Sequence, residues 1–286
     1  MSDLNETTIT EAVLASLRNS KTPRARQIGE ALVRHLHAFI REVRPSEAEW
    51  EAGIRFLTDT GQKCDDKRQE YILLSDTLGV STLVDSINHP SQPRVTETTV
   101  FGPFYVPPPE FSNGDDIRGN LEGTPLYICG TVRSPSGAPI ADAVVDVWHS
   151  DEAGFYDVQQ LDKTGGLAAR GRFRTGPDGS FQLWTVKPSP YPIPTDGPVG
   201  DMLRAQGRHP YRPEHVHFMI QAPGYQKLVT HVFASGDQYL GSDAVFGVKS
   251  SLIREFVLHR DDTAPDGRTL PGEWFELRYD FGLQPA

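Results

Sequence analysis

The sequence predicts a mainly β protein with an α-helical N-terminal part, in which the β part is an antiparallel sandwich or barrel. Three observations support this prediction. Apolar residues recur at helical spacing over residues 25–90. From about Thr98 onward, short β-rich runs alternate with turn signals. Most of the 23 prolines and 26 glycines lie in this second part, where they preclude long helices.

Composition and charge exclude several classes of protein. The chain has 286 residues and a net charge of −10, which argues against a nucleic-acid partner. No apolar run approaches the roughly 18 residues of a membrane span, and the N-terminus lacks the features of a signal peptide. The two cysteines cannot form a disulfide framework. We therefore expect a cytoplasmic protein without a membrane span.

Three helical stretches are expected in the first part. The first has an apolar stripe from Ile28 to Val43 and ends at Pro45. Residues 46–49, Ser-Glu-Ala-Glu, have the form of a capping box and open the second stretch. The third carries apolar residues over 71–84 and stops before Pro90.

The second part contains short segments that are rich in β-branched and aromatic residues. Turns are predicted at 134–137 and 177–180. The proline-rich stretch 187–198 is expected to be an ordered loop beside the strands, where functional residues are common. Strands are expected at residues 126–132, 143–149, 180–186, 215–220, 228–234 and 273–281.

A pair of histidines suggests a metal site. On a strand, His215 and His217 point to the same face, so both imidazoles can reach one ion. His35 and His37 have the same spacing in a predicted helix, where they diverge by about 200° and are expected at the surface. By itself the strand pair is compatible with structural histidines as well as with ligands.

Three completions of such a site can be considered. A cupin-like site needs a carboxylate soon after the pair, and residues 218–222 contain none. A ferrous site could use His149 and Asp151 in an H-x-D pattern. A ferric site could use Tyr156 and Tyr191, since a highly charged ion favours anionic oxygen donors and can deprotonate a phenol. Spacing alone leaves the ferrous and ferric alternatives open.

Five segments have a pattern specific enough to identify a family. The most specific is 208-RHPYRPEHVHFMIQAPGY-225. The others are 98-TTVFGPFYV-106, 137-GAPIADAVVDVWHSDEAGFYD-157, 171-GRFRTGPDGSF-181 and 190-PYPIPTDGPVGDML-203. Together these segments resemble the intradiol ring-cleavage dioxygenases, and in particular their hydroxyquinol 1,2-dioxygenase branch, and the resemblance covers nearly the whole chain. It implies an antiparallel β-sandwich catalytic domain at 98–286 that follows an N-terminal helical dimerisation domain at 1–97.

The resemblance also implies a metal centre. One ferric ion per subunit would be bound by two tyrosines and two histidines, and His149 and Asp151 would belong to the scaffold. Carried over to this sequence, the ligands are Tyr156, Tyr191, His215 and His217.

The reaction implied is the cleavage of an aromatic diol or triol by O2 between its two adjacent oxygenated carbons. Tyr191 would take a substrate proton, while the ferric ion acts as a Lewis acid. Arg212 would stabilise negative charge on the substrate, which suits a permanently charged guanidinium. His231 stands where the catechol branch usually has glutamine, which favours the hydroxyquinol branch, and it would shape the site and handle protons.

The same resemblance implies a substrate pocket. Asp76 would accept a hydrogen bond from the third hydroxyl group of hydroxyquinol, unless it is a helix-surface residue. The expected lining residues are Leu73, Asp76, Val100, Phe101, Gly102, Pro103, Phe104, Ile193, Pro194, Arg212 and Val245.

The resemblance also implies a homodimer. Members of the family form homodimers through their N-terminal helices, often with a phospholipid in the interface, although the apolar stripes would equally suit packing within one chain.

Two other functions are compatible with the sequence. One rival function is that of a catechol or chlorocatechol 1,2-dioxygenase with the same mechanism. A rival of another class is a metal-free binding sandwich.

Overall fold

The computed structural model describes residues 3–65 and 68–286. The chain divides into two compact units, residues 1–59 and residues 60–286. In the described residues, no helix is both long and apolar enough to cross a membrane.

All secondary-structure elements in the described residues of the first unit are helices. The unit contains α1 (Ile9–Ser16), a 3₁₀ turn η1 (Leu17–Asn19), α2 (Pro23–Val43) and most of α3 (Glu47–Gln62). The predicted capping box is confirmed at the start of α3. The Ser46 backbone N–H donates to Glu49 Oε2 over 2.8 Å, and the Glu49 backbone N–H donates to Ser46 Oγ over 3.3 Å.

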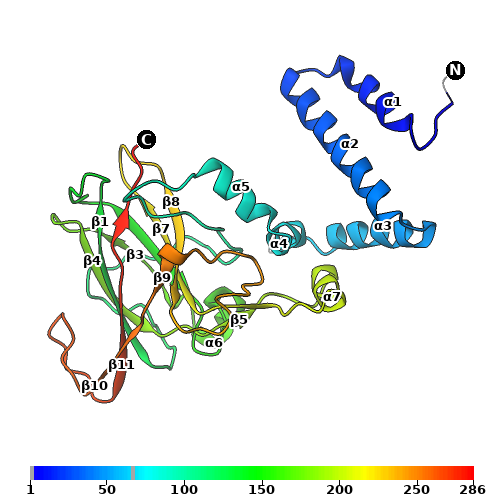
Figure 1. The fold of residues 1–286 in the computed structure, drawn as a ribbon. Coiled ribbons are helices and arrows are strands. Elements are labelled where there is room, and N and C mark those ends of the chain that lie inside the picture. Colours follow the sequence, from blue (N-terminus) through cyan, green and yellow to red (C-terminus); the bar gives the residue numbers. More distant parts are fainter. Residues whose placement is uncertain (1–2, 66–67) are drawn as a thin grey trace. The chain divides into compact units, whose positions relative to one another are not determined.

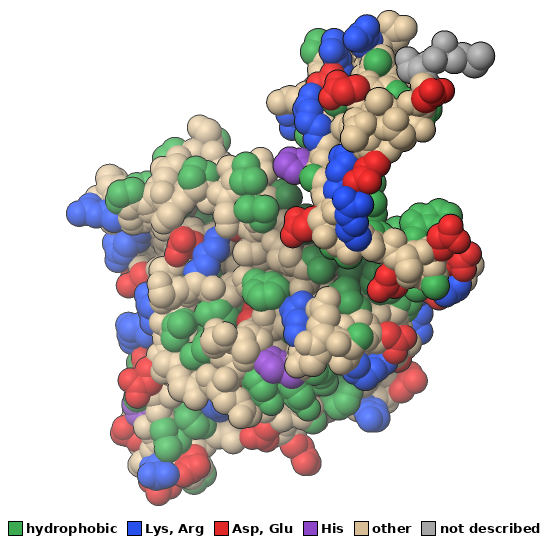
Figure 2. All heavy atoms as spheres, turned by 45° about the vertical axis from the view of Figure 1, so that its right-hand side comes forward, with side chains coloured by type: hydrophobic (Ala, Val, Ile, Leu, Met, Phe, Trp, Pro, Cys, Tyr) green, Lys and Arg blue, Asp and Glu red, His purple; other side chains and the backbone are tan. Residues whose placement is uncertain are grey.

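The apolar stripe of α2 is exposed in the single chain. Leu32 and Leu36 keep 64% and 53% of their surface, and none of the residues of α2 is buried. Green hydrophobic side chains accordingly appear among the charged ones on this unit (Figure 2). A stripe of this kind usually marks a contact surface.

The helices of the second unit differ from the expectation of one stretch over 71–84. The chain forms α4 (Glu70–Thr77) and α5 (Val80–Asn88), which are separated at Gly79. Gly79 has φ 72°, a left-handed conformation that glycine adopts without strain and that ends α4. The remaining helical segments are η2 (Asp157–Gln159), α6 (Leu161–Thr164), α7 (Pro198–Ala205) and η3 (Ser250–Leu252).

Two five-stranded sheets form the sandwich (Figure 1). The first sheet consists of β1 (Pro125–Arg133), β4 (Ser180–Val186), β10 (Val257–Arg260), β11 (Glu273–Arg278) and β12 (Phe281–Gly282). The second has the order β3 (Arg170–Arg174), β2 (Val144–His149), β7 (His215–Gln221), β8 (Leu228–Ala234) and β9 (Ile253–Arg254). A small separate hairpin pairs β5 (Tyr191–Pro192) with β6 (Tyr211–Arg212).

The expectation of purely antiparallel sheets is wrong in detail. Strand β1 pairs in parallel with β11 and β12, and β8 pairs in parallel with β9. These partners are distant in sequence and are not joined by tight turns, so the hairpin geometry that dictates antiparallel pairing does not apply to them.

Strand β7 has two buried faces with different roles. Val216, Phe218 and Ile220 belong to the main core, as the two-residue period of a strand requires. His215 and His217 point to the other face of the same sheet, and both are at most 2% exposed. The outer face of this sheet is therefore covered as well, and polar side chains are buried there.

Candidate metal centre

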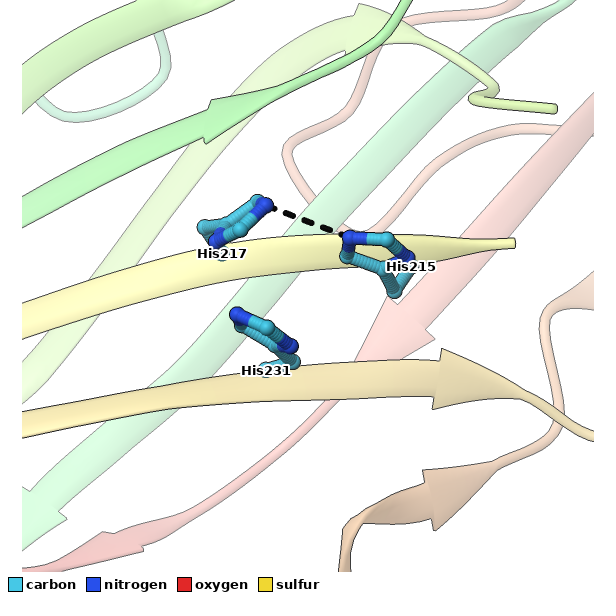
Figure 3. Close-up of side chains that lie close together, drawn as sticks. All are labelled: His215, His217 and His231. Atoms are coloured by element: carbon cyan, nitrogen blue, oxygen red, sulfur yellow. Dashed lines mark hydrogen bonds between the residues drawn. The ribbon is translucent and has the colours of Figure 1, made fainter. Parts of the chain in front are cut away.

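Four side chains from three segments meet at the outer face of the second sheet. His215 and His217 lie on β7, Tyr156 precedes η2, and Tyr191 lies in β5. Tyr156 Oη is 2.8 Å from His217 Nε2 and 3.3 Å from Tyr191 Oη. The two Nε2 atoms of the histidines are 3.2 Å apart (Figure 3). All four residues are buried, with at most 4% exposed surface.

Local structure explains why Tyr156 faces inward. Gly154 has φ 85°, and a Cβ there would lie 3.0 Å from Tyr191 Cβ, so the two segments approach closely only with glycine. The Tyr156 backbone N–H donates to Gln159 Oε1 over 2.9 Å. Phe104 stacks on the phenol ring with centroids 4.4 Å apart. The turn at Gly154 and the hydrogen bond to Gln159 thus fix the backbone of Tyr156, and Phe104 fixes its ring.

The neighbouring ion pair also supports Tyr156. Arg170 Nε donates to Asp157 Oδ2 over 2.7 Å, and both residues are almost completely buried. Arg170 Nη2 donates to the Phe104 carbonyl over 3.0 Å. The Arg170 guanidinium therefore connects Asp157, which follows Tyr156 in the chain, to Phe104, which stacks on the Tyr156 ring.

The protonation of the histidines suits a ligand role. His215 Nδ1 is 2.6 Å from the Pro213 carbonyl, which can only accept, so Nδ1 carries the proton and Nε2 bears the lone pair. Burial and then Arg212 lower the pKa of His215 well below its usual value. Burial and then His231 do the same for the pKa of His217. Both rings are therefore neutral.

The donor set fits a metal ion. With metal–ligand bonds of about 2.0–2.2 Å, neighbouring ligand atoms lie roughly 3 Å apart, as these atoms do. Burial and then Tyr191 raise the pKa of Tyr156, so its phenol stays neutral unless a cation offsets the phenolate charge. His217 Nδ1 is a buried atom without a partner in the described part of the chain. His215, His217 and His231 also form a group that could bind a metal.

Arg212 and His231 border the four side chains. The register of the small hairpin places Arg212 opposite Tyr191. The register of β7 with β8 places His231 opposite His217. Arg212 Nη1 is 3.3 Å from His215 Nε2, and Arg212 Nη2 is 3.3 Å from His231 Nδ1. A buried guanidinium thus lies beside the four side chains.

The expected pocket residues are found in three environments. Leu73, Val100, Ile193 and Val245 pack in one apolar cluster that joins α4 to three loops. Gly102 lies against His217, since a Cβ there would be 3.2 Å from its Cε1 atom. Phe104 stacks on the ring of Tyr156, and the ring of the exposed Phe101 lies 5.9 Å from that of Trp148. The two prolines lie nearer the surface, Pro103 exposed and Pro194 half-buried.

Asp76 is a buried residue and not a surface aspartate. It is 6% exposed. Burial raises the pKa of its carboxyl group, although the hydrogen bond from Ser81 and the charge of Arg212 both lower it. Arg212 and Asp243 act on it electrostatically, so Asp76 lies in the electrostatic environment of the candidate site.

The ferrous alternative finds no support in the geometry. Both nitrogens of His149 are engaged, Nδ1 with the Ser150 carbonyl at 2.6 Å and Nε2 with Thr185 Oγ1 at 2.8 Å. Asp151 Oδ1 accepts hydrogen bonds from two backbone N–H groups of its own turn. Among the described residues, neither belongs to a metal-binding group. The pair fixes the end of β2, as the resemblance implied.

Sequence reasoning missed two residues that contact the site. Trp148 stacks on His217 with centroids 4.7 Å apart. Asp243 holds Arg212, with 3.1 Å between Asp243 Oδ1 and Arg212 Nε. The alternation of strand β2 could have placed Trp148 on the outer face. No sequence signal marks Asp243, because it lies in a loop 31 residues from its partner.

Family models match both parts of the chain. A model described as the catechol dioxygenase N terminus matches residues 22–96, and one described as dioxygenase matches residues 100–285.

Individual relatives match over the full length. A hydroxyquinol 1,2-dioxygenase from Nocardioides simplex is 48% identical, over 98% of this chain and 96% of the relative. A 6-chlorohydroxyquinol 1,2-dioxygenase from Cupriavidus pinatubonensis is 49% identical over the whole of both chains. The crystal structure of a hydroxyquinol 1,2-dioxygenase from Pseudomonas putida DLL-E4 superimposes with a TM-score of 0.93 at 48% identity, covering 98% of this chain and 99% of that one.

Proposed function

Because this chain belongs to the family of intradiol ring-cleavage dioxygenases, we propose that it cleaves hydroxyquinol (1,2,4-trihydroxybenzene) with O2. The bond broken joins the two adjacent oxygenated carbons, and the product is 3-hydroxy-cis,cis-muconate, the enol tautomer of maleylacetate. The observation that carries this proposal is the convergence of two phenol oxygens and two imidazole nitrogens in one buried place.

Intradiol dioxygenases bind non-haem iron. The proposed cofactor is one ferric ion per subunit, held by Tyr156, Tyr191, His215 and His217. When bound, ferric iron acts as a Lewis acid that withdraws electron density from the diol ring and as a template for its two oxygens.

The side chains themselves perform the remaining work. The Pro213 carbonyl keeps the proton of His215 on Nδ1, so that Nε2 faces the site. Tyr191 would be a phenolate when it holds the ion, and its Oη would then accept a proton from one substrate hydroxyl and store it near the ring. Arg212 keeps its positive charge and is buried away from water, so it stabilises the negative charge that develops on the substrate. His231 lies beside Arg212, where it orients the substrate and handles protons.

Binding of the aromatic ring is assigned to the apolar cluster around Val100 and Val245, together with the 98–106 segment. Asp76 accepts a hydrogen bond from the third hydroxyl group of the substrate. A diol without that hydroxyl leaves a buried carboxylate without this partner, which lowers the affinity for catechol. Catechol or chlorocatechol is the alternative substrate, and cleavage would then follow the same mechanism.

Assembly is proposed to be homodimeric. Residues 1–97 form the dimerisation domain in this proposal, and residues 98–286 the catalytic domain. The exposed stripe of α2 supplies the apolar contact surface, which a phospholipid can also cover. The proposed location is the cytoplasm, in keeping with two free cysteines.

The test is a comparison of turnover on two substrates. Purified protein is assayed for iron and for its visible spectrum, before and after anaerobic addition of hydroxyquinol. Oxygen uptake is then measured with hydroxyquinol and with catechol. We expect a wine-red protein with a higher kcat/KM for hydroxyquinol. A preference for catechol would establish the alternative substrate, and a colourless protein without bound iron or turnover would favour a metal-free binding sandwich.

A further inference from the structure

One edge of the Arg212 guanidinium is held by a single carboxylate. Arg212 Nε donates to Asp243 Oδ1 over 3.1 Å, and Nη2 donates to Oδ2 over 3.4 Å. Arg212 is 3% exposed and Asp243 is 4% exposed. A side-on pair of this kind restricts both the position and the rotation of the guanidinium.

Asp243 is itself held in place by the loop 243–247. Its Oδ2 accepts the Gly247 backbone N–H over 2.9 Å, and its Oδ1 accepts that of Val245 over 3.3 Å. A Cβ at Gly247 would lie 3.0 Å from Arg212 Nη2 and 3.2 Å from Asp243 Oδ2, so a larger residue there would press on both partners of the ion pair. Thr99 Oγ1 donates to the Gly247 carbonyl over 2.9 Å. Asp243 is therefore a fixed anchor point.

The other side of Arg212 faces two histidines, His215 and His231. Arginine has only donors, so His231 Nδ1 must accept from Nη2, and the proton of the neutral ring is on Nε2. His231 Nε2 is buried and has no partner among the described residues. Arg212 thus occupies the Nδ1 lone pair of His231 and leaves the ring proton on Nε2.

We propose that Asp243 is a positioning residue, which fixes Arg212 so that the guanidinium faces the substrate oxygens and keeps His231 in the Nε2–H tautomer. This inference rests on the proposed function for the role of Arg212. Asp243 does not contact the four proposed metal ligands in any described interaction, so it acts through Arg212. Burial of Arg212 without this partner would leave a charged group uncompensated.

A double-mutant cycle tests whether Asp243 acts through Arg212. Asp243→Asn is expected to lower kcat for hydroxyquinol about 10- to 100-fold. Iron content is expected to stay unchanged, and the Kd for hydroxyquinol in anaerobic titration to change less than about 3-fold. In an Arg212→Gln background the same substitution should lower kcat less than about 2-fold. Equal losses in both backgrounds would overturn the proposal.

A second readout does not depend on turnover. The full chain is labelled with ¹⁵N-histidine, loaded with diamagnetic gallium(III), and its imidazole nitrogens are followed by NMR. Wild type should show His231 as the Nε2–H tautomer, and Asp243→Asn should show a mixture. An unchanged tautomer in Asp243→Asn contradicts the inference. A wild type that cleaves neither hydroxyquinol nor catechol refutes the proposed function instead, and this measurement still decides the role of Asp243.

Two further variants separate positioning from loop stability. Asp85→Asn removes a carboxylate that binds Lys249 over 3.1 Å, two residues beyond the loop, and it should change kcat less than about 2-fold. A loss equal to that of Asp243→Asn would assign the effect to loop stability. If Asp243→Asn does not fold, Asp243→Glu replaces it in the cycle, with an expected loss of about 3- to 10-fold that is again absent with Arg212→Gln.

Discussion

At the scale of the residue, the chemistry of the site depends on the position of a few oxygen and nitrogen atoms. Tyr191 illustrates this, because its ring is buried and its Oη lies 3.3 Å from that of Tyr156. Neither burial nor aromatic packing requires the hydroxyl group, so its removal isolates the function of one atom.

Tyr191→Phe is expected to lower kcat for hydroxyquinol by about 10²-fold or more, since proton transfer by a positioned group contributes on this scale. The visible band should also change, because one phenolate-to-iron transition disappears. The matched control is Tyr127→Phe, which removes the hydroxyl of another buried tyrosine that donates to Gln182. Full activity of Tyr191→Phe would show that its assigned role is wrong.

The variant Asp76→Asn tests whether this carboxylate makes the protein prefer hydroxyquinol over catechol. The substitution should reduce kcat/KM for hydroxyquinol about 5- to 100-fold and have a smaller effect with catechol, because only hydroxyquinol has a hydroxyl group for this carboxylate. Steady-state kinetics with both substrates measure the ratio. Asp85→Asn, which removes a carboxylate of α5, serves as the control and should leave the ratio unchanged. Equal losses on both substrates would remove the selective role of Asp76.

The buried His149 makes the free energy of unfolding depend on pH. Burial lowers its pKa to about 4, from a usual value of about 6.5. The folded state therefore binds fewer protons than the unfolded state between these values, and stability falls as the pH decreases from about 6.5 to 4. This one residue contributes about 3 kcal/mol to the fall. Unfolding free energies of iron-free protein should show a shallower decrease in His149→Gln, and parallel curves would contradict the assignment.

At the scale of the element, a buried carboxylate joins α4 to α7. Glu70 is completely buried, and its Oε1 accepts the Val199 backbone N–H over 3.2 Å at the start of α7. Arg68 Nε donates to Glu70 Oε2 over 2.8 Å. The contact fastens the end of the proline-rich loop that carries Tyr191 to the helix that carries Asp76.

Glu70→Gln is expected to lower the free energy of unfolding by roughly 1–3 kcal/mol, because it weakens a buried charge-assisted hydrogen bond. The matched control is Asp196→Asn. Asp196 binds the same Arg68, but its side chain is 66% exposed, so the loss should stay below about 1 kcal/mol. Denaturant titration of both variants checks the difference, and similar losses would show that burial does not decide the strength of this contact.

At the scale of the whole molecule, we expect the exposed apolar stripe of α2 to be buried against a second copy of the chain. Leu36→Glu places a charge in that stripe and is expected to shift the protein from dimer to monomer in sedimentation experiments. Ala38→Glu, on the opposite side of α2, is the control and should leave the dimer intact. A Leu36→Glu variant that remains dimeric would show that dimerisation uses another surface.

The sequence predicted much of the fold because the relevant signals are local. The strands at 180–186 and 228–234 have the predicted bounds, and the capping box at Ser46 forms as expected. The helical break at Gly79 was not predicted, because apolar residues on both sides continue at helical spacing. Parallel pairing of β1 with β11 was not predicted either, since no local pattern encodes the partner of a strand 150 residues away.

The sequence by itself determined which residue types are available and which of them share a face. The period of a strand places His215 and His217 together, whatever the remainder of the molecule does. Only the tertiary structure decided that Tyr156 and Tyr191 reach the same place and that Asp243 holds Arg212. The physical reason is that such contacts join segments far apart in the chain, and their positions follow from the packing of the sheets and loops as a whole, not from any local periodicity.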